Sequence, residues 1–368
     1  MKPFSIQTEI VEYDTFAQFA QELGPKDLLF CGKHTYTDFV EPLHLDIQTM
    51  FRETYSKGEP IDGDVDAILA ALKEVEYERL IAIGGGSVID IAKMIAVAGK
   101  EDTVDTLFDQ KDSLKKKHPL IIVPTTCGTG SEVTNISVIN RVSKGVKMGL
   151  ASPAMLPDQA ILITDLLESL PYSVFATSSI DAMVHSVESF LSPNGCTLSR
   201  IFSQKALETI VSCWKKSVEK GDWKSYAAEF LKASNWAGIA FGYAGCAAVH
   251  ACAYPLGSVY HLSHGQSNQI MFQPVMKKYK KVQPQGRIND LEDLLSKVFD
   301  CCSEQALEEL YMLMDQILKS EPLHSFGVKE SDLETFAHDV LKSQQRLLNN
   351  NYVPLSQEDV LEIYKSAY

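Results

Sequence analysis

Three histidines stand in one long uncharged stretch of the sequence. His250, His261 and His264 fall within a run from Ala233 to Met276 that has no Asp, Glu, Lys or Arg, although charged residues make up 22% of the 368-residue chain. Burying several imidazoles without partners costs free energy, so they need something that satisfies their ring nitrogens. A bound metal ion would do this.

A carboxylate and a further imidazole occur together earlier in the chain. In SSIDAMVHSVES, Asp181 and His185 are four residues apart, so both side chains leave one face of a helix. Alone, such a pair is more often a contact on a helix surface. With several buried histidines it forms a set of oxygen and nitrogen donors that suits Fe(II) or Zn(II) better than Ca(II) or Mg(II). The sequence therefore predicts a site for a divalent transition metal.

Two glycine-rich loops follow short apolar runs in the first half of the chain. Gly84, Gly85, Gly86 and Ser87 separate a β-branched run from a helical pattern, where a helix start presents free N–H groups to an anion such as a diphosphate. A tight strand-helix turn without a ligand is the alternative. The second loop, PTTCGTGSEVT at 124–134, adds threonine hydroxyls suited to ribose, phosphate or nicotinamide. Two such loops at the carboxyl ends of strands predict a nucleotide crevice.

The elements that carry these residues divide the chain into two parts. Up to about residue 165, strand-like and helical runs alternate, as in a parallel sheet covered by helices. Beyond Pro171 the pattern is helical throughout. We therefore expect an α/β domain at 1–165 and an all-helical domain at 166–368. The expected strands are 4–13, 27–32, 79–83 and 118–126, and the expected helices in the first part are 14–23, with Asp14 as N-cap, 62–78 and the segment after Gly86.

Composition excludes several classes of partner. The net charge is -14, from 34 Lys and Arg against 48 Asp and Glu, and the longest basic run is Lys115 to Lys117. This argues against binding to nucleic acid or to anionic membranes. The N-terminus, MKPFSIQTEIVEYD, has no apolar core with a cleavage site, so we expect a cytoplasmic protein that acts on a small molecule.

The uncharged run has the length of a membrane helix between Asn235 and Leu256, but it contains His250, several small residues and Pro255. A tightly packed internal helix is the better interpretation. The eight cysteines form no C-x-x-C pair, so we expect mostly reduced, buried thiols.

Taken in order, GGGSVIDIAK, PTTCGTGSEVTN, DAMVHSVES and VHACAYPLG followed by SHGQSN resemble the iron-containing (group III) alcohol dehydrogenases, over essentially the whole chain. The resemblance implies a Rossmann-like dinucleotide-binding domain and an all-α domain, the fold shared with dehydroquinate synthase. It also implies NAD(H), a divalent metal with Fe(II) favoured and Zn(II) as the alternative, and a homodimer. Within the family, the chain is most similar to members that interconvert 4-hydroxybutyrate and succinate semialdehyde.

The resemblance also assigns site residues. The implied metal ligands are Asp181, His185, His250 and His264. The implied cofactor contacts are Gly85, Gly86, Ser87 and Asp90 at the pyrophosphate, Thr125, Thr126 and Thr134 near the nicotinamide, and Lys147 at a ribose.

The chain departs from the family pattern at two places. Tyr254 stands where many members have a histidine, so either His261 or Tyr254 is the expected proton relay, the alternative for His261 being a satisfied core histidine. Gly32, followed by Lys33, stands where members that exclude NADP tend to carry an acidic residue, so it supplies no carboxylate for the ribose hydroxyls and NADP use stays open. The closer resemblance within the family favours NAD. For a substrate carboxylate, Arg346 is one candidate, its alternative being a solvated or ion-pairing arginine.

The mechanism implied by the resemblance is hydride transfer between the nicotinamide and a carbon whose oxygen is polarised by the metal. Three other functions compete with this one: dehydrogenation of an uncharged primary alcohol or diol, cyclisation of a sugar phosphate, and non-catalytic nucleotide binding on the same fold. Turnover measured together with metal content separates them.

Overall fold

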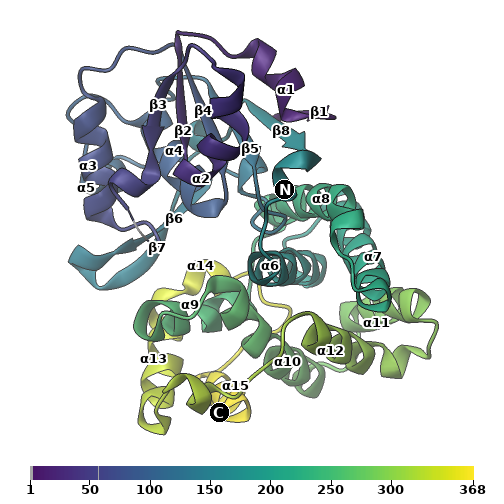
Figure 1. Ribbon diagram of the computed structural model, residues 1–368. Coiled ribbons are helices and arrows are strands. Elements are labelled where there is room, and N and C mark those ends of the chain that lie inside the picture. The colour runs from purple at the N-terminus through teal and green to yellow at the C-terminus, as the bar shows by residue number, and fades with distance from the viewer. Residues whose placement is uncertain (1–2, 57) are drawn as a thin grey trace. The chain divides into compact units, whose positions relative to one another are not determined.

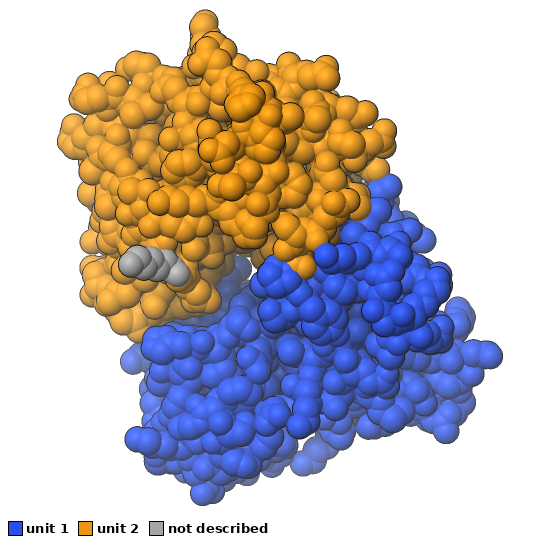
Figure 2. Space-filling model, viewed as in Figure 1, with its two compact units in different colours: residues 1–4, 171–368 blue, residues 5–170 orange. Residues whose placement is uncertain are grey.

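The computed structural model describes residues 3–56 and 58–368 and divides them into two compact units. One unit runs from Ser5 to Leu170, and the other runs from Pro171 to Tyr368 and includes the segment up to Phe4. Figure 2 colours the two units separately. The α/β and all-helical parts expected from the sequence are both present, whereas residues 1 and 2 of the predicted first domain lie outside the described residues.

The observed boundary lies beyond the predicted one at residue 165. A short 3-10 turn, Thr164–Leu167, continues the α/β unit because Asp165 Oδ2 accepts a hydrogen bond of 2.8 Å from the backbone N–H of Phe16. At the other end of this unit, Phe4 belongs to the helical unit since its ring stacks on Phe202 with centroids 6.1 Å apart. The predicted boundary rests on the change from alternating to helical sequence patterns, and that change gives no information about either contact.

The α/β unit is built on a six-stranded parallel sheet with the order β1-β8-β5-β4-β2-β3 (Figure 1). Its strands are β1 (Glu9–Tyr13), β2 (Asp27–Cys31), β3 (Gln48–Phe51), β4 (Arg79–Gly84), β5 (Leu120–Pro124) and β8 (Gln159–Ile163). The helices of this unit are α1 (Phe16–Phe19), α2 (Lys33–Thr35), α3 (Asp62–Leu72), α4 (Gly86–Val97) and α5 (Val104–Asp109).

Both faces of the sheet are buried, which explains the continuous apolar runs in its central strands. Alternate residues of β2, β4 and β5, such as Phe30, Ala82 and Ile122, pack with α3, α4 and α5 in one core cluster. The intervening residues, such as Leu29 and Ile83, pack with α1 and β8 in another. This alternation holds the carboxyl ends of β4 and β5 in register, and the glycine-rich loops start there.

Several local expectations need correction. The strand predicted at 4–13 begins only at Glu9, and α1 is capped by the side chain of Thr15, not of Asp14, through a capping box with Gln18. Sequence analysis missed β3, β8 and an antiparallel hairpin formed by β6 (Ile136–Arg141) and β7 (Val146–Ala151). β3 has four residues and the hairpin strands are partly exposed, whereas β8 is buried; the pairing of β3 and β8 in the sheet depends on contacts distant in sequence.

Every helix and 3-10 turn from Pro171 onward belongs to the helical unit, and no strand occurs among residues 171–368. Helix α6 (Tyr172–Leu191) is its central element, because every residue from Ser179 to Leu191 is buried and it packs on α7, α8 and α10. The other helices are α7 (Thr197–Lys220), α8 (Ala227–Ala244), α9 (Ala248–Tyr260), α10 (His264–Val282), α11 (Arg287–Phe299), α12 (Ala306–Ile317), α13 (Leu333–Ser343), α14 (Gln345–Leu348) and α15 (Gln357–Ala367).

The uncharged run forms most of α8, all of α9 and the first part of α10, and most of its side chains are buried. Within the described residues, no single helix is long and apolar enough to cross a membrane. The segments 224–244 and 248–260 satisfy that criterion only as a pair bent by 104°.

Candidate functional site

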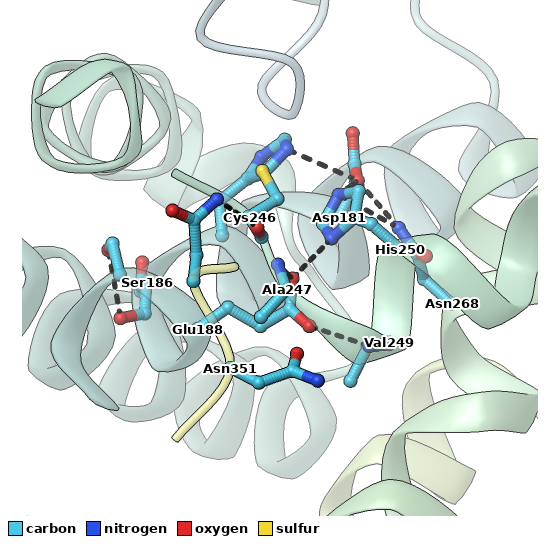
Figure 3. A network of polar contacts seen from close by, with 12 residues as sticks. Asp181, Ser186, Glu188, Cys246, Ala247, Val249, His250, Asn268 and Asn351 are labelled. Atoms are coloured by element: carbon cyan, nitrogen blue, oxygen red, sulfur yellow. Dashed lines mark hydrogen bonds and ion pairs between the residues drawn. The ribbon is translucent and has the colours of Figure 1, made fainter. Parts of the chain in front are cut away.

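Three helices bring the four predicted metal ligands into one cluster. Helix α6 carries Asp181 and His185 one turn apart, α9 carries His250, and α10 begins at His264. The Oδ1 atom of Asp181 lies 3.4 Å from Nε2 of His250, 3.4 Å from Nε2 of His264 and 3.8 Å from Nε2 of His185. Figure 3 shows Asp181 and His250 facing one another in this network.

The donor set fits a divalent ion. The candidate ligand atoms of Asp181, His250 and His264 all lie within 4.8 Å of one another, as do those of His185, Cys246 and His250. Burial alone would raise the pKa of Asp181, but the three surrounding imidazoles lower it below its ordinary value. One carboxylate surrounded by imidazole nitrogens is a site that Fe(II) or Zn(II) favours.

Glu188 holds the imidazole of His250 from the side opposite Asp181. This fully buried carboxylate accepts hydrogen bonds from the backbone N–H groups of Ala247 (2.8 Å) and Val249 (2.6 Å), and it lies 2.6 Å from Nδ1 of His250 (Figure 3). The two backbone N–H groups can only donate, and an ionised carboxylate can only accept, so Glu188 also accepts from the imidazole. It fixes the proton on Nδ1 and leaves Nε2 directed at Asp181, as ligand histidines require.

Charge also links Glu188 with His250. Burial alone would lower the pKa of His250, but Glu188 and Asp181 raise it to about 9. A positive charge at this place is therefore favoured, and a divalent cation supplies it without a proton.

Asn268 is a second residue of the cluster that sequence analysis missed. Its Nδ2 donates to Oδ1 of Asp181 over 2.8 Å and lies 3.5 Å from Nε2 of His250 and of His264. Glu188 and Asn268 were both missed, although their spacing from predicted ligands could have indicated them. Asn268 follows His264 by one helical turn, and Glu188 follows His185 by three residues, so each shares a helix face with a predicted ligand.

Gly265 allows α10 to approach α6 closely enough for His264 to reach Asp181. A Cβ atom at this position would overlap the backbone carbonyl of Thr177 on α6. Only glycine fits such a close approach of two backbones, so the site geometry depends on a missing side chain as well as on the ligands.

The predicted proton-relay residues lie in different surroundings. Tyr254 is buried one turn after His250, and its ring centroid is 6.0 Å from that of His264. His261 is exposed at the C-cap of α9 in a left-handed conformation with φ 58°. Of the two residues, Tyr254 therefore lies beside the histidine cluster, and the role of either as a proton relay stays a prediction.

Arg346 lies on α14, which is tied to the turn before α9. The side-chain Nδ2 of Asn350 donates both to the carbonyl of Arg346 (3.1 Å) and to that of Cys246 (2.9 Å). Burial raises the pKa of the Cys246 thiol well above its ordinary value, and the Arg346 guanidinium opposes this rise. An exposed positive charge is thus held near a residue that borders the histidine cluster.

In the α/β unit, the two glycine-rich loops pack against each other. Gly85 is the N-cap of α4, and a Cβ atom there would lie 3.1 Å from the methyl group of Thr126. A Cβ atom at Gly86 would lie 2.8 Å from the methyl group of Thr129. The backbone of Gly85, Gly86 and Ser87 therefore begins α4 beside the loop that contains Thr125 and Thr126, with the positive end of the helix dipole open to an anion.

The remaining predicted cofactor residues are engaged by protein groups. Asp90 accepts from Ser131 Oγ and from the N–H of Val138, each over 2.9 Å. The Nζ atom of Lys147 lies 2.8 Å from Oε1 of Glu59. The roles of Asp90 and Lys147 in cofactor binding stay predictions. In the structure, the hydrogen bonds of Asp90 hold the end of the second loop and the start of β6 in place.

Lys93, which sequence analysis did not single out, also fixes this segment. Its fully buried Nζ donates to Ser131 Oγ (2.7 Å), to the predicted cofactor residue Thr134 (3.1 Å) and to the carbonyl of Ile136 (2.7 Å). Burial lowers the pKa of Lys93 to about 8, although Asp90 and Glu132 oppose this effect.

Comparison with known proteins identifies the family. Residues 9–164 match the iron-containing alcohol dehydrogenase profile, and residues 175–368 match the C-terminal profile of the Fe-containing alcohol dehydrogenase family. The chain belongs to the iron-containing alcohol dehydrogenase family. The expectation from the sequence motifs is thereby confirmed.

Relatives within the family cover most or all of the chain. The 4-hydroxybutyrate dehydrogenase of Clostridium kluyveri is 41% identical over 372 residues, which cover 100% of both chains. Long-chain-alcohol dehydrogenase 1 of Geobacillus thermodenitrificans is 34% identical over 91% of this chain and 82% of its own. Solved structures show the same fold: sulfoacetaldehyde reductase from Bifidobacterium kashiwanohense in complex with NAD+ has a TM-score of 0.86 at 20% identity, covering 100% of this chain and 98% of its own.

Proposed function

We propose that this iron-containing alcohol dehydrogenase interconverts 4-hydroxybutyrate and succinate semialdehyde with NAD(H) and a divalent metal. The observation that carries the proposal is the full-length similarity to the 4-hydroxybutyrate dehydrogenase of Clostridium kluyveri. The cluster of Asp181 with the buried His185 and His250 and the partly exposed His264 supports the metal-dependent chemistry. Fe(II) is favoured by the family, and Zn(II) suits the same donors.

In this mechanism, Asp181, His185, His250 and His264 would hold the metal, which when bound acts as a Lewis acid on the alcohol or aldehyde oxygen. NAD(H), when bound, would supply the hydride chemistry. The α4 N-terminus would bind the pyrophosphate through Gly85, Gly86 and Ser87, and Thr125 and Thr126 follow on the adjoining loop.

A proton must pass between the substrate oxygen and solvent, and Tyr254 is our first candidate for holding it at its phenolic oxygen. Tyr254→Phe should lower turnover and leave metal content unchanged. His261→Ala is the comparison, because His261 is exposed. Full turnover in Tyr254→Phe with reduced turnover in His261→Ala would exchange the two assignments.

Arg346 is the proposed partner of the substrate carboxylate. Its charge lies near Cys246 at the edge of the cluster, and arginine binds carboxylates through paired, charge-assisted hydrogen bonds. A 4-hydroxy acid brings its carboxylate three carbons from the reacting carbon, so one cation close to the metal site is what such a substrate requires.

The test is an anaerobic assay of the Fe(II)-loaded protein, in which NADH absorbance is followed with succinate semialdehyde and with an uncharged aldehyde of equal length. We expect NADH to be oxidised rapidly with the semialdehyde and only slowly with the uncharged aldehyde. In Arg346→Met, kcat/KM for the semialdehyde should fall about 10–100-fold, the range of a lost charged hydrogen bond. The slow reaction with the uncharged aldehyde should not change.

Equal or faster oxidation with the uncharged aldehyde would favour the second candidate, a dehydrogenase of uncharged primary alcohols or diols. The 34% identity to long-chain-alcohol dehydrogenase 1 supports that alternative. A homodimer and a cytoplasmic location stay predictions from the sequence; light scattering and cell fractionation test them.

A further inference from the structure

A carboxylate from the turn after β3 lies at the end of β2, where β2 itself is followed by Gly32 and not by an acidic residue. Strands β2 and β3 are paired, with Cys31 opposite Phe51, and Glu53 follows in the short turn Arg52–Thr54. Its Oε2 accepts a hydrogen bond of 3.0 Å from the backbone N–H of Lys33.

Gly32 provides the room for this carboxylate. A Cβ atom at Gly32 would lie only 2.9 Å from Oε1 of Glu53. The backbone of Gly32 is extended, with φ -78° and ψ 150°, so its conformation does not demand glycine. The side chain of Glu53 therefore occupies the space in which a side chain of residue 32 would begin.

This position corresponds to a specific part of a bound dinucleotide. Strand β2 lies next to β4 in the sheet, with Cys31 opposite Ile83, and β4 leads into Gly85 and Gly86 at the start of α4. When a pyrophosphate binds at such a helix start, the adenosine ribose lies at the end of the neighbouring strand. An acidic side chain there accepts hydrogen bonds from the ribose hydroxyls and repels a 2′-phosphate.

We propose that the Glu53 carboxylate binds the adenosine ribose and selects NAD over NADP, in place of the acidic residue that position 32 lacks. This proposal rests on the use of a nicotinamide cofactor in the proposed function. Lys33 is exposed and carries the opposite charge, which would favour a 2′-phosphate, but its backbone N–H already orients Glu53. Selectivity therefore depends on which of the two charges contacts the ribose.

The experiment measures binding without catalysis. ADP-ribose and its 2′-phosphate are titrated calorimetrically into the full-length protein, so neither the metal nor the substrate enters the readout. Glu53→Ala removes the carboxylate, and Glu53→Ala combined with Gly32→Asp moves it to the neighbouring strand. The control, Glu78→Gln, removes an equal charge at the opposite end of the same sheet, just before β4, where Glu78 pairs with Lys26.

We expect the wild type and Glu78→Gln to prefer ADP-ribose. Glu53→Ala should reduce that preference by at least about tenfold, as expected for a lost hydrogen bond to a charged group, and the double variant should restore it. An unchanged preference in Glu53→Ala overturns the proposal, as does a lost preference that the double variant does not restore. A wild type without preference also overturns it, whereas a wild type that binds neither nucleotide refutes the dinucleotide dependence of the proposed function itself.

Discussion

The predicted metal site and the predicted cofactor-binding loops differ in the groups that they offer to a ligand. The predicted metal site consists of side chains from three helices that meet in a largely buried cluster, and its chemistry depends on residue type. The loops after β4 and β5 present mainly backbone groups, and their chemistry depends on conformation and on the absence of side chains. A substitution in the metal site should therefore remove a ligand atom, whereas a substitution in the loops should change the shape of the backbone that faces the cofactor.

The largest expected effect tests the side-chain half of this comparison. Asp181→Ala removes the carboxylate that lies within 4 Å of all three imidazoles, so metal binding should become undetectable in competition with a chelator. Binding of ADP-ribose should not change. An Asp181→Ala protein with full metal content and full activity would contradict the ligand assignment.

Adding one methyl group to each region makes the comparison sharper. In Gly265→Ala the new methyl overlaps the backbone of Thr177, which cannot move aside, so we expect a loss of about 3 kcal/mol in unfolding free energy and weaker metal binding. In Gly86→Ala it meets only the methyl end of Thr129, so the loss should be about 1 kcal/mol.

Denaturant titration measures both losses, and separate titrations with metal and ADP-ribose show which site is affected. Gly86→Ala should weaken nucleotide binding alone, since the methyl lies on the backbone that would face the pyrophosphate. Two variants that lose both ligands equally would show that the regions are not independent.

Within the metal centre, Glu188→Gln separates orientation from ligation. Glutamine has one acceptor oxygen, yet Ala247, Val249 and His250 all donate to Glu188, so one donor must face the amide N–H₂. We expect metal affinity to fall about 10–100-fold, as is usual when the partner of a ligand histidine is lost.

The control for Glu188→Gln is Ser186→Ala, a buried position on the same helix whose hydroxyl donates only to Ala182. A His250→Gln background tests the route of the effect. If Glu188 acts through His250, its substitution should change metal affinity little in that background; an equal loss in both backgrounds would assign Glu188 a general structural part.

A further expected effect lies in the α/β unit and appears only when the pH is changed. Burial lowers the pKa of Lys93 from 10.5 to about 8, so between these values the unfolded chain holds a proton that the folded chain lacks. Stability then rises with pH across this window, by up to about 3 kcal/mol in total. Lys93→Met lacks this rise, so the difference in unfolding free energy between wild type and variant should increase from pH 8 to 10.5. A constant difference would contradict the lowered pKa of Lys93.

The sequence predicted the residues with distinctive chemistry better than those that act through contacts distant in the chain. The glycine loops and the Asp and His ligands have types and spacings that indicate their roles. The spacing of Glu188 from His185 places the two on one helix face, but only the packing of α6 against the start of α9 shows what Glu188 binds. For Glu53, the pairing of β3 with β2 is the first indication of its position. The domain boundary was displaced for the same reason, since the bond from Phe16 to Asp165 joins segments far apart in sequence.

The position of Glu188 couples metal binding to local order. The same carboxylate binds the free N–H groups at the start of α9 and the imidazole of His250 in its first turn. An ion held by His250 therefore stabilises the hydrogen bonds that begin the helix, and free energy of binding becomes free energy of helix formation. In an amide hydrogen-exchange experiment, the amides of Ala247 and Val249 should exchange more slowly as metal is added, at metal concentrations that do not yet slow exchange in α7. Metal binding would then hold the start of α9 in its helical conformation.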